Sequence, residues 1–273
     1  MDGAGRTGKS MNVHYCASIM VLKASIHMID RIFDKEGYTT FLALTKSELN
    51  TTRTFIYKQW FNIIEKASNG ELSFIKESSF PITKYHLIKT NYNHSRAFRK
   101  TNRMLGKDFC MWFEGSAFFE QLTNHFGEFT ISDEEKLGYS NYYWRLTRPK
   151  ENSDVGPLHR DSWFWDIDID YRFPYDKFHR IKVWIPIHIT KGLNGLLIAP
   201  GSQKNKEIKW TTELRDGNKK PQITFIPDDL EIELVMSNDG TAVIFNDDLL
   251  HGGAPNKSSN SRVSMEFTMI IKD

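Results

Sequence analysis

The chain has 273 residues, of which 40% are hydrophobic and 13% aromatic, so it is long enough to bury a sizeable core. Its formal net charge is only +2 and its basic residues are spread along the chain, which argues against a nucleic-acid-binding surface. The two cysteines, Cys16 and Cys110, are too few for a disulfide framework and are typical of a reducing compartment. No apolar run is long enough to span a bilayer. We therefore expect a soluble cytoplasmic protein without a membrane partner, and its oligomeric state stays open.

The N-terminal stretch GAGRTGKS, residues 3–10, matches the phosphate-loop pattern G-x-x-x-x-G-K-[ST]. A phosphate loop needs a buried strand in front of it, and only two residues precede this one. We therefore expect residues 1–27 to be a flexible or additional segment, and residues 28–273 to be a single domain. A nucleotide-binding protein that uses this loop is the less favoured alternative, and it predicts that Lys9→Ala abolishes activity.

Residues 11–127 are predicted to be mainly helical. Residues 45–68 carry apolar side chains at helical spacing, and Thr45 or Ser47 can cap the start of this helix. A second helix is expected over 111–127, where the sequence MWFEGSAFFEQLTNHFG ends at a glycine.

From about residue 139 the chain changes to short segments rich in β-branched and aromatic residues, separated by glycine, proline and asparagine turns. Seven segments have this character: SNYYWRLTRP, IKVWIPIHIT, GLLIAPGS, QITFIP, IELVMS, TAVIFND and RVSMEFTMII. Helices followed by many short strands favour an α+β domain with a β-sandwich or barrel at its C-terminal end. The charged stretch 204–220 is expected to be a solvated loop, either over one mouth of this barrel or without a role.

A histidine and an aspartate lie two residues apart in GPLHRDSWFWD, so on a strand His159 and Asp161 would leave the same face. This pair alone is weak evidence. Further along, an apolar strand runs up to His251, a turn rich in glycine and serine follows, and a second strand begins at Arg262. An antiparallel hairpin would bring Arg262 close to His251, with Ser264 on the same face as Arg262. Three apolar residues would face the other way: Val263, Met265 and Phe267.

Two imidazoles and one carboxylate on one side of a metal leave its other coordination positions open, which is the ligand set of non-haem Fe(II) oxygenases. The sequence therefore predicts an iron and catalytic centre made by His159, Asp161 and His251. The guanidinium of Arg262 can bind the distal carboxylate of a dicarboxylate through two parallel hydrogen bonds, and the Ser264 hydroxyl can add a third. This combination predicts Fe(II), 2-oxoglutarate as cosubstrate, and O₂.

These residues resemble the phytanoyl-CoA dioxygenase family of Fe(II)/2-oxoglutarate-dependent oxygenases over about residues 30–272. The likeness includes the opening FDKEGYTTFLALTKSEL, the H-x-D pair at His159, the segment NGLLIAPGSQ, and His251 with Arg262 eleven residues later. The family often has histidine where NGLLIAPGSQ ends in glutamine. The resemblance implies an α+β fold with a double-stranded β-helix core, a cupin-like jelly-roll, and N-terminal helices packed on its outer face.

The resemblance also implies where cosubstrate and substrate are bound. In similar enzymes the strand before H-x-D points polar side chains at them, which makes three residues candidates for cosubstrate binding: Tyr143, Arg145 and Thr147. The alternate residues of that strand are expected in the core: Tyr142, Trp144 and Leu146. Trp165 resembles an aromatic residue that lines the pocket in relatives, and its neighbour Trp163 is a second candidate for substrate binding.

Relatives that halogenate lack the carboxylate ligand, so the presence of Asp161 favours hydroxylation. The resemblance implies hydroxylation of an aliphatic C–H bond with release of succinate and CO₂, while desaturation and cyclisation stay open. Arg145, Arg148 and the neighbouring aromatic residues favour a small anionic or amphipathic metabolite. A jelly-roll binding module that has lost its chemistry is the main alternative. It would show no visible absorption band on anaerobic addition of Fe(II) and 2-oxoglutarate.

Overall fold

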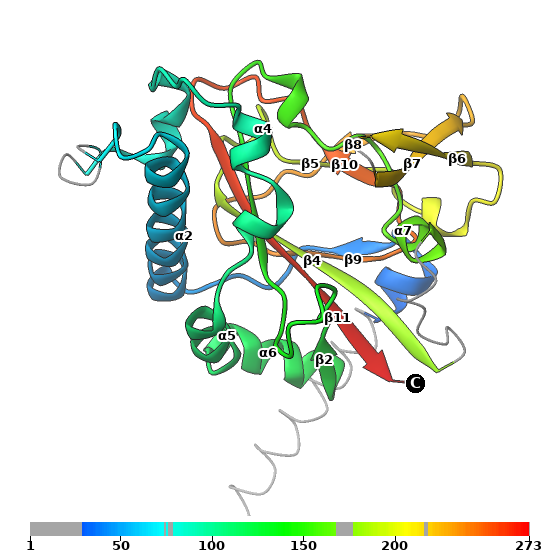
Figure 1. Ribbon diagram of the computed structural model, residues 1–273. Helices are drawn as coiled ribbons and strands as arrows, with labels where there is room; N and C mark the ends of the chain where they lie inside the picture. The colour runs from blue at the N-terminus through cyan, green and yellow to red at the C-terminus, as the bar shows by residue number, and fades with distance from the viewer. Residues whose placement is uncertain (1–28, 74, 76–78, 168–176, 216–217, 273) are drawn as a thin grey trace, which may run out of the picture.

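The computed structural model describes residues 29–73, 75, 79–167, 177–215 and 218–272. The segment predicted to be flexible or additional, residues 1–27 with the GAGRTGKS motif, lies outside these residues. Helices dominate the first half of the described chain and strands the second half, so the predicted α+β class is confirmed (Figure 1). Within the described ranges no helix is both long and apolar enough to cross a membrane.

Helical residues of the described chain include 29–34, α2 (Lys46–Ala67), α4 (His94–Ala97), α5 (Lys107–Glu114), α6 (Ala117–Phe126) and α7 (Ser162–Ile167). Short 3-10 helices are η1 (Ile82–Leu87), η2 (Lys100–Arg103), η3 (Asn152–Asp154) and η5 (Ser202–Lys204). The strands of the first half and centre are β1 (Tyr38–Thr39), β2 (Phe129–Ile131), β3 (Tyr143–Thr147), β4 (Phe178–His188) and β5 (Leu196–Ile198). The remaining strands are β6 (Lys209–Arg215), β7 (Asn218–Phe225), β8 (Glu233–Leu234), β9 (Val243–Asn246), β10 (His251–Gly253) and β11 (Arg262–Lys272).

Helix α2 starts at the predicted cap. The Thr45 hydroxyl accepts a hydrogen bond from the Glu48 N–H (3.2 Å), and the Glu48 carboxylate accepts one from the Thr45 N–H (2.7 Å), which forms a capping box. The other carboxylate oxygen of Glu48 accepts a hydrogen bond from the Phe118 N–H (2.9 Å) in the first turn of α6. One buried carboxylate therefore caps two helices. The helix ends just before Asn69 and Gly70, which both have positive φ.

The segment predicted as one helix over 111–127 is two helices, and that prediction was wrong. The chain turns at Gly115, and the Ser116 hydroxyl accepts a hydrogen bond from the Phe119 N–H (3.2 Å) to start α6. A glycine costs about 1 kcal/mol in a helix interior, and a serine that follows it is a strong N-cap, so the break is favoured on both counts. The predicted end at Gly127, with φ of 73°, is confirmed.

The strands form two antiparallel sheets that lie on opposite sides of an interior, and a separate two-stranded ribbon. The large sheet has the order β1-β9-β4-β11-β2, and β3 also pairs with β11. The small sheet has the order β10-β5-β8, and β6 pairs with β7. Figure 1 shows helices α5 and α6 on one side of the large sheet and the small sheet on the other. The large sheet therefore has one face toward the helices and one toward the small sheet.

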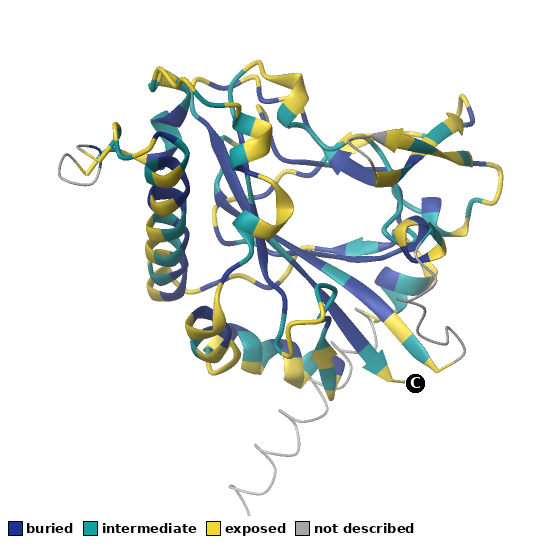
Figure 2. Ribbon diagram, in the orientation of Figure 1, coloured by how far each residue is buried: buried dark blue, intermediate teal, exposed yellow. Residues whose placement is uncertain are grey.

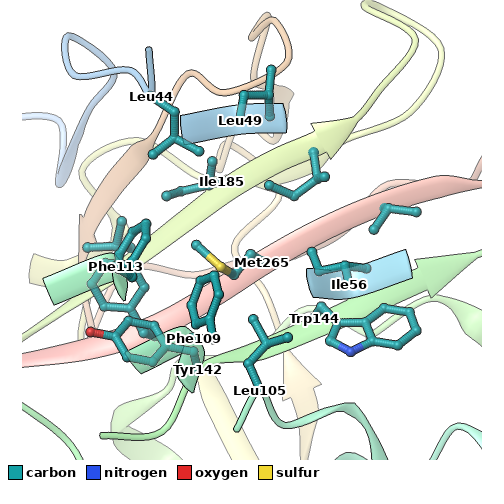
Figure 3. Close-up of a cluster of buried hydrophobic side chains, with 14 of the residues drawn as sticks. Leu44, Leu49, Ile56, Leu105, Phe109, Phe113, Tyr142, Trp144, Ile185 and Met265 are labelled. Carbon is teal, nitrogen blue, oxygen red and sulfur yellow. The ribbon is translucent and has the colours of Figure 1, made fainter. Parts of the chain in front are cut away.

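The main core lies between the helices and the large sheet, where Figure 2 shows the strands as mostly buried. Alternate residues of β4 and β11 belong to it: Ile181, Val183, Ile185, Ile187, Val263, Met265, Phe267 and Met269. Figure 3 shows Met265 next to the ring of Phe109 in α5, and Ile185 near Leu44. The residues of β3 and the position before it that were predicted to be core are also in this cluster: Tyr142, Trp144 and Leu146. Burying each such large side chain contributes about 1.5–3 kcal/mol.

The pairing of the C-terminal strands differs from the predicted hairpin. Strand β10, which begins at His251, pairs with β5 of the small sheet, whereas β11 pairs with β2, β3 and β4 of the large sheet. The connection between them crosses from one sheet to the other. The Asn256 amide holds this crossing in place by donating to the carbonyl oxygens of Thr147 (2.9 Å) and Asn260 (2.8 Å). The hairpin prediction was therefore wrong, because it considered only the partner nearest in sequence.

The charged stretch 204–220 is not the predicted loop. Its larger part forms β6 and the start of β7, which pair from Lys209 with Phe225 to Arg215 with Asn218. Trp210 of this hairpin stacks on Trp163 of α7, with ring centroids 5.2 Å apart. The hairpin is therefore anchored beside the helix that follows the H-x-D pair.

Candidate active site

His159 and His251 are held side by side by their own backbones. The N–H of each donates to the carbonyl oxygen of the other, at 2.8 and 2.9 Å, and the ring centroids are 4.4 Å apart. This single bridge is the only ladder contact of His159 in the described chain, and α7 begins at Ser162. His159 and Asp161 therefore do not lie on a regular strand, so the geometry that the sequence analysis considered for this pair does not apply. The residues after the bridge enter a helix instead of continuing the ladder.

Both imidazole rings are oriented by backbone carbonyl groups. His159 Nδ1 lies 2.8 Å from the Pro157 oxygen, and His251 Nδ1 lies 2.9 Å from the Leu249 oxygen. A carbonyl oxygen can only accept, so each Nδ1 carries the proton and each Nε2 presents a lone pair. This is the tautomer that binds a metal through Nε2.

The Asp161 carboxylate lies beside both free nitrogens. Its Oδ1 is 3.4 Å from His159 Nε2 and 3.8 Å from His251 Nε2, and one ligand atom from each residue lies within 4.8 Å of the others. The three side chains that the sequence singled out therefore meet at one point. Two nitrogens and one oxygen at this spacing suit a single divalent transition metal.

The protonation states also suit metal binding. Burial raises the pKa of Asp161, but the positive charge of Lys182 is the largest of the opposing influences, and together they hold this pKa well below its usual range. Burial and the neighbouring His159 lower the pKa of His251 to about 4. At neutral pH the cluster offers a charged carboxylate and a neutral His251, which are the forms that bind a metal.

Arg262 and Ser264 lie on the face of β11 that is opposite to the helices. The Arg262 side chain is buried and donates to Thr147 Oγ1 (2.9 Å) and to the Gly195 carbonyl oxygen. Arg262 Nε and Ser264 Oγ are buried without a hydrogen-bond partner among the described residues. Burial and the charge of Arg145 lower the pKa of Arg262 to about 10, so it stays protonated at neutral pH. A buried guanidinium with one unsatisfied N–H, together with the unsatisfied hydroxyl of Ser264, fits a carboxylate ligand.

The predicted cosubstrate residues of β3 have different surroundings. Thr147 contacts Arg262 directly, as described above. Arg145 donates through Nε to Glu266 (3.0 Å), and 41% of its side chain is exposed. The Tyr143 hydroxyl instead contacts Glu135 and Asn141, each at 3.3 Å. The hydroxyls of Thr147 and Tyr143 are therefore both engaged with neighbouring side chains, whereas the Arg145 side chain is partly exposed.

The two candidate tryptophans of α7 are both buried. Trp165 packs against Arg180, whose guanidinium carbon lies 4.7 Å from the ring centroid. Trp163 belongs to a cluster on the hairpin side, which also contains Ala199, Ile208 and Leu250. This packing favours a structural role for Trp163. Phe164 between them is 40% exposed, and its ring lies edge-on to the His159 ring at 5.4 Å.

Two charged residues beside the cluster were not predicted. Lys182 Nζ lies 3.5 Å from Asp161 Oδ2, and Glu266 pairs with Arg145. The signal was present in the sequence, because Lys182 interrupts the apolar strand IKVWIPIHIT and Glu266 has the same parity as Arg262. Charged residues at alternate positions of otherwise apolar strands indicate a polar interior.

A model of the phytanoyl-CoA dioxygenase family matches residues 81–264. The chain belongs to the phytanoyl-CoA dioxygenase family. It is therefore a non-haem Fe(II)- and 2-oxoglutarate-dependent oxygenase that uses O₂, as the resemblance of its motifs implied. No curated protein matches the chain.

Solved structures share the fold of this chain. EvdO2 from Micromonospora carbonacea var. aurantiaca, complexed with 2-oxoglutarate, is 11% identical with a TM-score of 0.57, over 99% of this chain and 94% of that one. The non-heme monooxygenase ThoJ in its apo form is 15% identical with a TM-score of 0.53, over 89% of this chain and 77% of that one. EctD from S. alaskensis, with 2-oxoglutarate and 5-hydroxyectoine, is 13% identical with a TM-score of 0.52, over 91% of this chain and 75% of that one.

Proposed function

We propose that this oxygenase hydroxylates an aliphatic C–H bond of a small anionic or amphipathic metabolite and releases succinate and CO₂. The observation that carries the proposal is the convergence of His159, Asp161 and His251 on one point, each in its metal-binding form. A carboxylate ligand is present, which supports hydroxylation over halogenation. Desaturation and cyclisation are alternative outcomes of the product analysis described below.

The three converging side chains would hold Fe(II) through His159 Nε2, His251 Nε2 and an oxygen of Asp161. Bound iron supplies the activation of O₂ and the oxidation itself. The chain contributes the orientation of the ligands, because backbone carbonyl groups fix both rings. It also contributes a buried position, because His251 is only 5% exposed.

Arg262 and Ser264 would bind the distal carboxylate of 2-oxoglutarate through the donors that have no partner in the described chain. Thr147 helps to hold the guanidinium by accepting a hydrogen bond from it. Asn256 in turn fixes the Thr147 backbone by donating to its carbonyl oxygen. This carboxylate-binding group is therefore held by the crossing between the two sheets, and it is formed before the cosubstrate binds.

Arg145 is the best-supported anchor for an anionic group on the substrate. Within the described residues only its Nε is hydrogen-bonded, and its Nη1 reaches toward Gly156, where an added Cβ would lie 3.7 Å away. Gly156 lies three residues before His159, so the guanidinium reaches the segment that carries this ligand. Arg148, the other candidate, is held by Asp154 through two hydrogen bonds of 2.8 and 2.9 Å. The exposed ring of Phe164 offers an apolar surface beside His159, which suits an amphipathic molecule.

We also propose that residues 28–273 form one oxygenase domain whose two facing sheets are a double-stranded β-helix. The continuous core from Ile32 to Met269 supports a single domain. The position of the proposed metal ligands supports the β-helix. His251 begins β10 of the small sheet, and the H-x-D segment is bridged to it through His159.

The proposal is tested by anaerobic titration of the protein with Fe(II) and 2-oxoglutarate, followed by O₂-dependent succinate release with a panel of small carboxylates, phosphonates and amphipathic acids. We expect a visible absorption band in the first step, and a product heavier by one oxygen atom in the second. Asp161→Ala should abolish product formation, whereas Asp34→Ala, an exposed carboxylate, should leave it unchanged. The absence of both band and succinate, or wild-type rates for Asp161→Ala, would contradict the proposal.

A further inference from the structure

Lys182 is a charged residue in the middle of β4, a mostly apolar strand of 11 residues. Its neighbours Ile181 and Val183 belong to the main core on the helix side, so Lys182 points to the interior face of the large sheet. Its side chain is only 12% exposed. Nζ lies 3.5 Å from Asp161 Oδ2 and donates to Thr268 Oγ1, also at 3.5 Å.

The two oxygens of Asp161 have different surroundings. Oδ1 faces the Nε2 atoms of both histidines. Oδ2 is buried without a hydrogen bond in the described chain, and its nearest charged partner is the Lys182 ammonium. One oxygen of the carboxylate is therefore directed to the ligand cluster, and the other is directed to a cation.

Lys182 itself is held in place from the far side. Thr268, which is opposite Lys182 in the β4–β11 ladder, accepts its hydrogen bond and donates to Glu134 Oε1 (3.4 Å). Glu134 is bound in turn by Lys100 at 2.7 Å. The ammonium therefore has a fixed position between Asp161 on one side and Thr268 on the other.

Burying an ammonium group costs several kcal/mol, and replacing a buried ion pair by apolar residues is often neutral or stabilising. The other positions of β4 show that this strand accepts isoleucine, valine and tryptophan. Stability alone therefore does not account for a lysine here, and its contact with Asp161 suggests a role in the site.

We propose that Lys182 is a positioning residue that keeps Asp161 bound to the metal through one oxygen. The inference rests on the proposed function, in which Asp161 is a metal ligand. With Oδ2 held by the ammonium, Asp161 presents Oδ1 alone. A carboxylate released from this contact can turn and offer both oxygens, which would occupy a position that 2-oxoglutarate needs.

The test uses the full chain loaded with Co(II), whose visible spectrum reports the number of ligands, and a titration of 2-oxoglutarate onto the loaded protein without O₂. In Lys182→Met we expect a changed Co(II) spectrum and about 10-fold weaker 2-oxoglutarate binding, at the low end of the 10- to 100-fold losses in metal affinity or activity that follow removal of groups behind metal ligands. Co(II) affinity should be unchanged or tighter, because the substitution removes a positive charge beside the ion.

Two matched variants separate positioning from a general effect of charge. Lys182→Arg restores a cation beside Oδ2 and should recover most of the 2-oxoglutarate affinity. Lys204→Met removes an exposed lysine that pairs with Asp34 and contacts neither Asp161 nor Glu134, and should resemble the wild type. Circular dichroism melting would establish that each variant is folded.

Failure of this inference is distinguishable from failure of the proposed function. If wild-type protein does not bind Co(II), or Asp161→Ala binds it equally well, the proposed metal site is wrong. If wild-type protein binds Co(II) but Lys182→Met has the same spectrum and the same 2-oxoglutarate affinity, the role of Lys182 is overturned alone. Loss of Co(II) binding by folded Lys182→Met would overturn it as well.

Discussion

The two faces of strand β11 differ in almost every physical property although they share one backbone. Met265 and Phe267 face the helices and are completely buried among apolar side chains. Arg262, Ser264 and Glu266 face the small sheet, where charged and polar contacts dominate. Because successive side chains of a strand point to opposite faces of the sheet, one set of β11 residues contributes to the core and the alternate set lines the proposed site. A substitution on one face should affect folding, and one on the other should affect ligand binding.

The two faces also differ in whether their buried groups all have contacts or hydrogen-bond partners. The helix face is packed, as Figure 3 shows for Ile185 and Met265. The interior face keeps buried donors without a partner in the described chain, at Arg262 and Ser264. Unsatisfied buried groups cost free energy, so their presence at the proposed site indicates that a ligand completes them.

The largest expected effect is on the helix face. Phe267→Ala removes a ring that packs against Tyr142 at 5.0 Å and Phe113 at 5.8 Å, and should lower the free energy of unfolding by about 3–5 kcal/mol. Urea denaturation measures this loss, and Phe225→Ala on the exposed hairpin should change it by less than about 0.5 kcal/mol. A loss below about 1 kcal/mol for Phe267→Ala would contradict the separation of the two faces.

Arg262→Ala tests the interior face of the same strand. We expect the 2-oxoglutarate dissociation constant to rise about 100-fold, or roughly 2.7 kcal/mol, because the fixed guanidinium is lost. Metal affinity should be retained, and Arg262→Lys should bind 2-oxoglutarate with an intermediate constant, because an ammonium cannot form the two-pronged contact. Calorimetric titration measures both ligands. Unchanged 2-oxoglutarate binding would remove Arg262 from the site, and equal loss of metal would indicate a general collapse.

The alternation that defines these two faces was predictable from the sequence, because it depends only on local period. The candidate set His159, Asp161 and His251 was predicted from residue chemistry and from the resemblance to the family, and the structure brings these three side chains together. What could not be predicted is which strands pair. His159 pairs with His251 across the fold and β11 pairs with β3 and β4, because non-local contacts decide register once several partners compete. The contact of Lys182 with Asp161 depends on that same pairing.

Glu48 tests whether a buried charge always marks a functional face. It lies on the helix side, 8% exposed, and caps both α2 and α6. Glu48→Ala should lower the free energy of unfolding by about 1–2 kcal/mol without a change in 2-oxoglutarate binding. Glu120→Ala, exposed in the first turn of α6, is the matched control and should change it by less than about 0.5 kcal/mol. A ligand-binding defect in Glu48→Ala would show that the two faces are coupled.

The smallest effect concerns His188 at the end of β4, away from the ligand cluster. Burial and the charge of Arg53 lower its pKa to about 4, so the folded protein holds it neutral where the unfolded chain takes up a proton near pH 6.5. Its contribution to stability is therefore present above pH 6.5 and is lost as the pH falls toward 4. When the pH falls from 7 to 5, the free energy of unfolding of the wild type should decrease by about 1 kcal/mol more than that of His188→Asn. Urea denaturation at both pH values measures this difference. An identical pH dependence in the two proteins would show that His188 is not the group responsible. His251 also has a pKa of about 4. Repeating the measurement with metal bound would then reveal whether the acid sensitivity comes from His251 on the interior face.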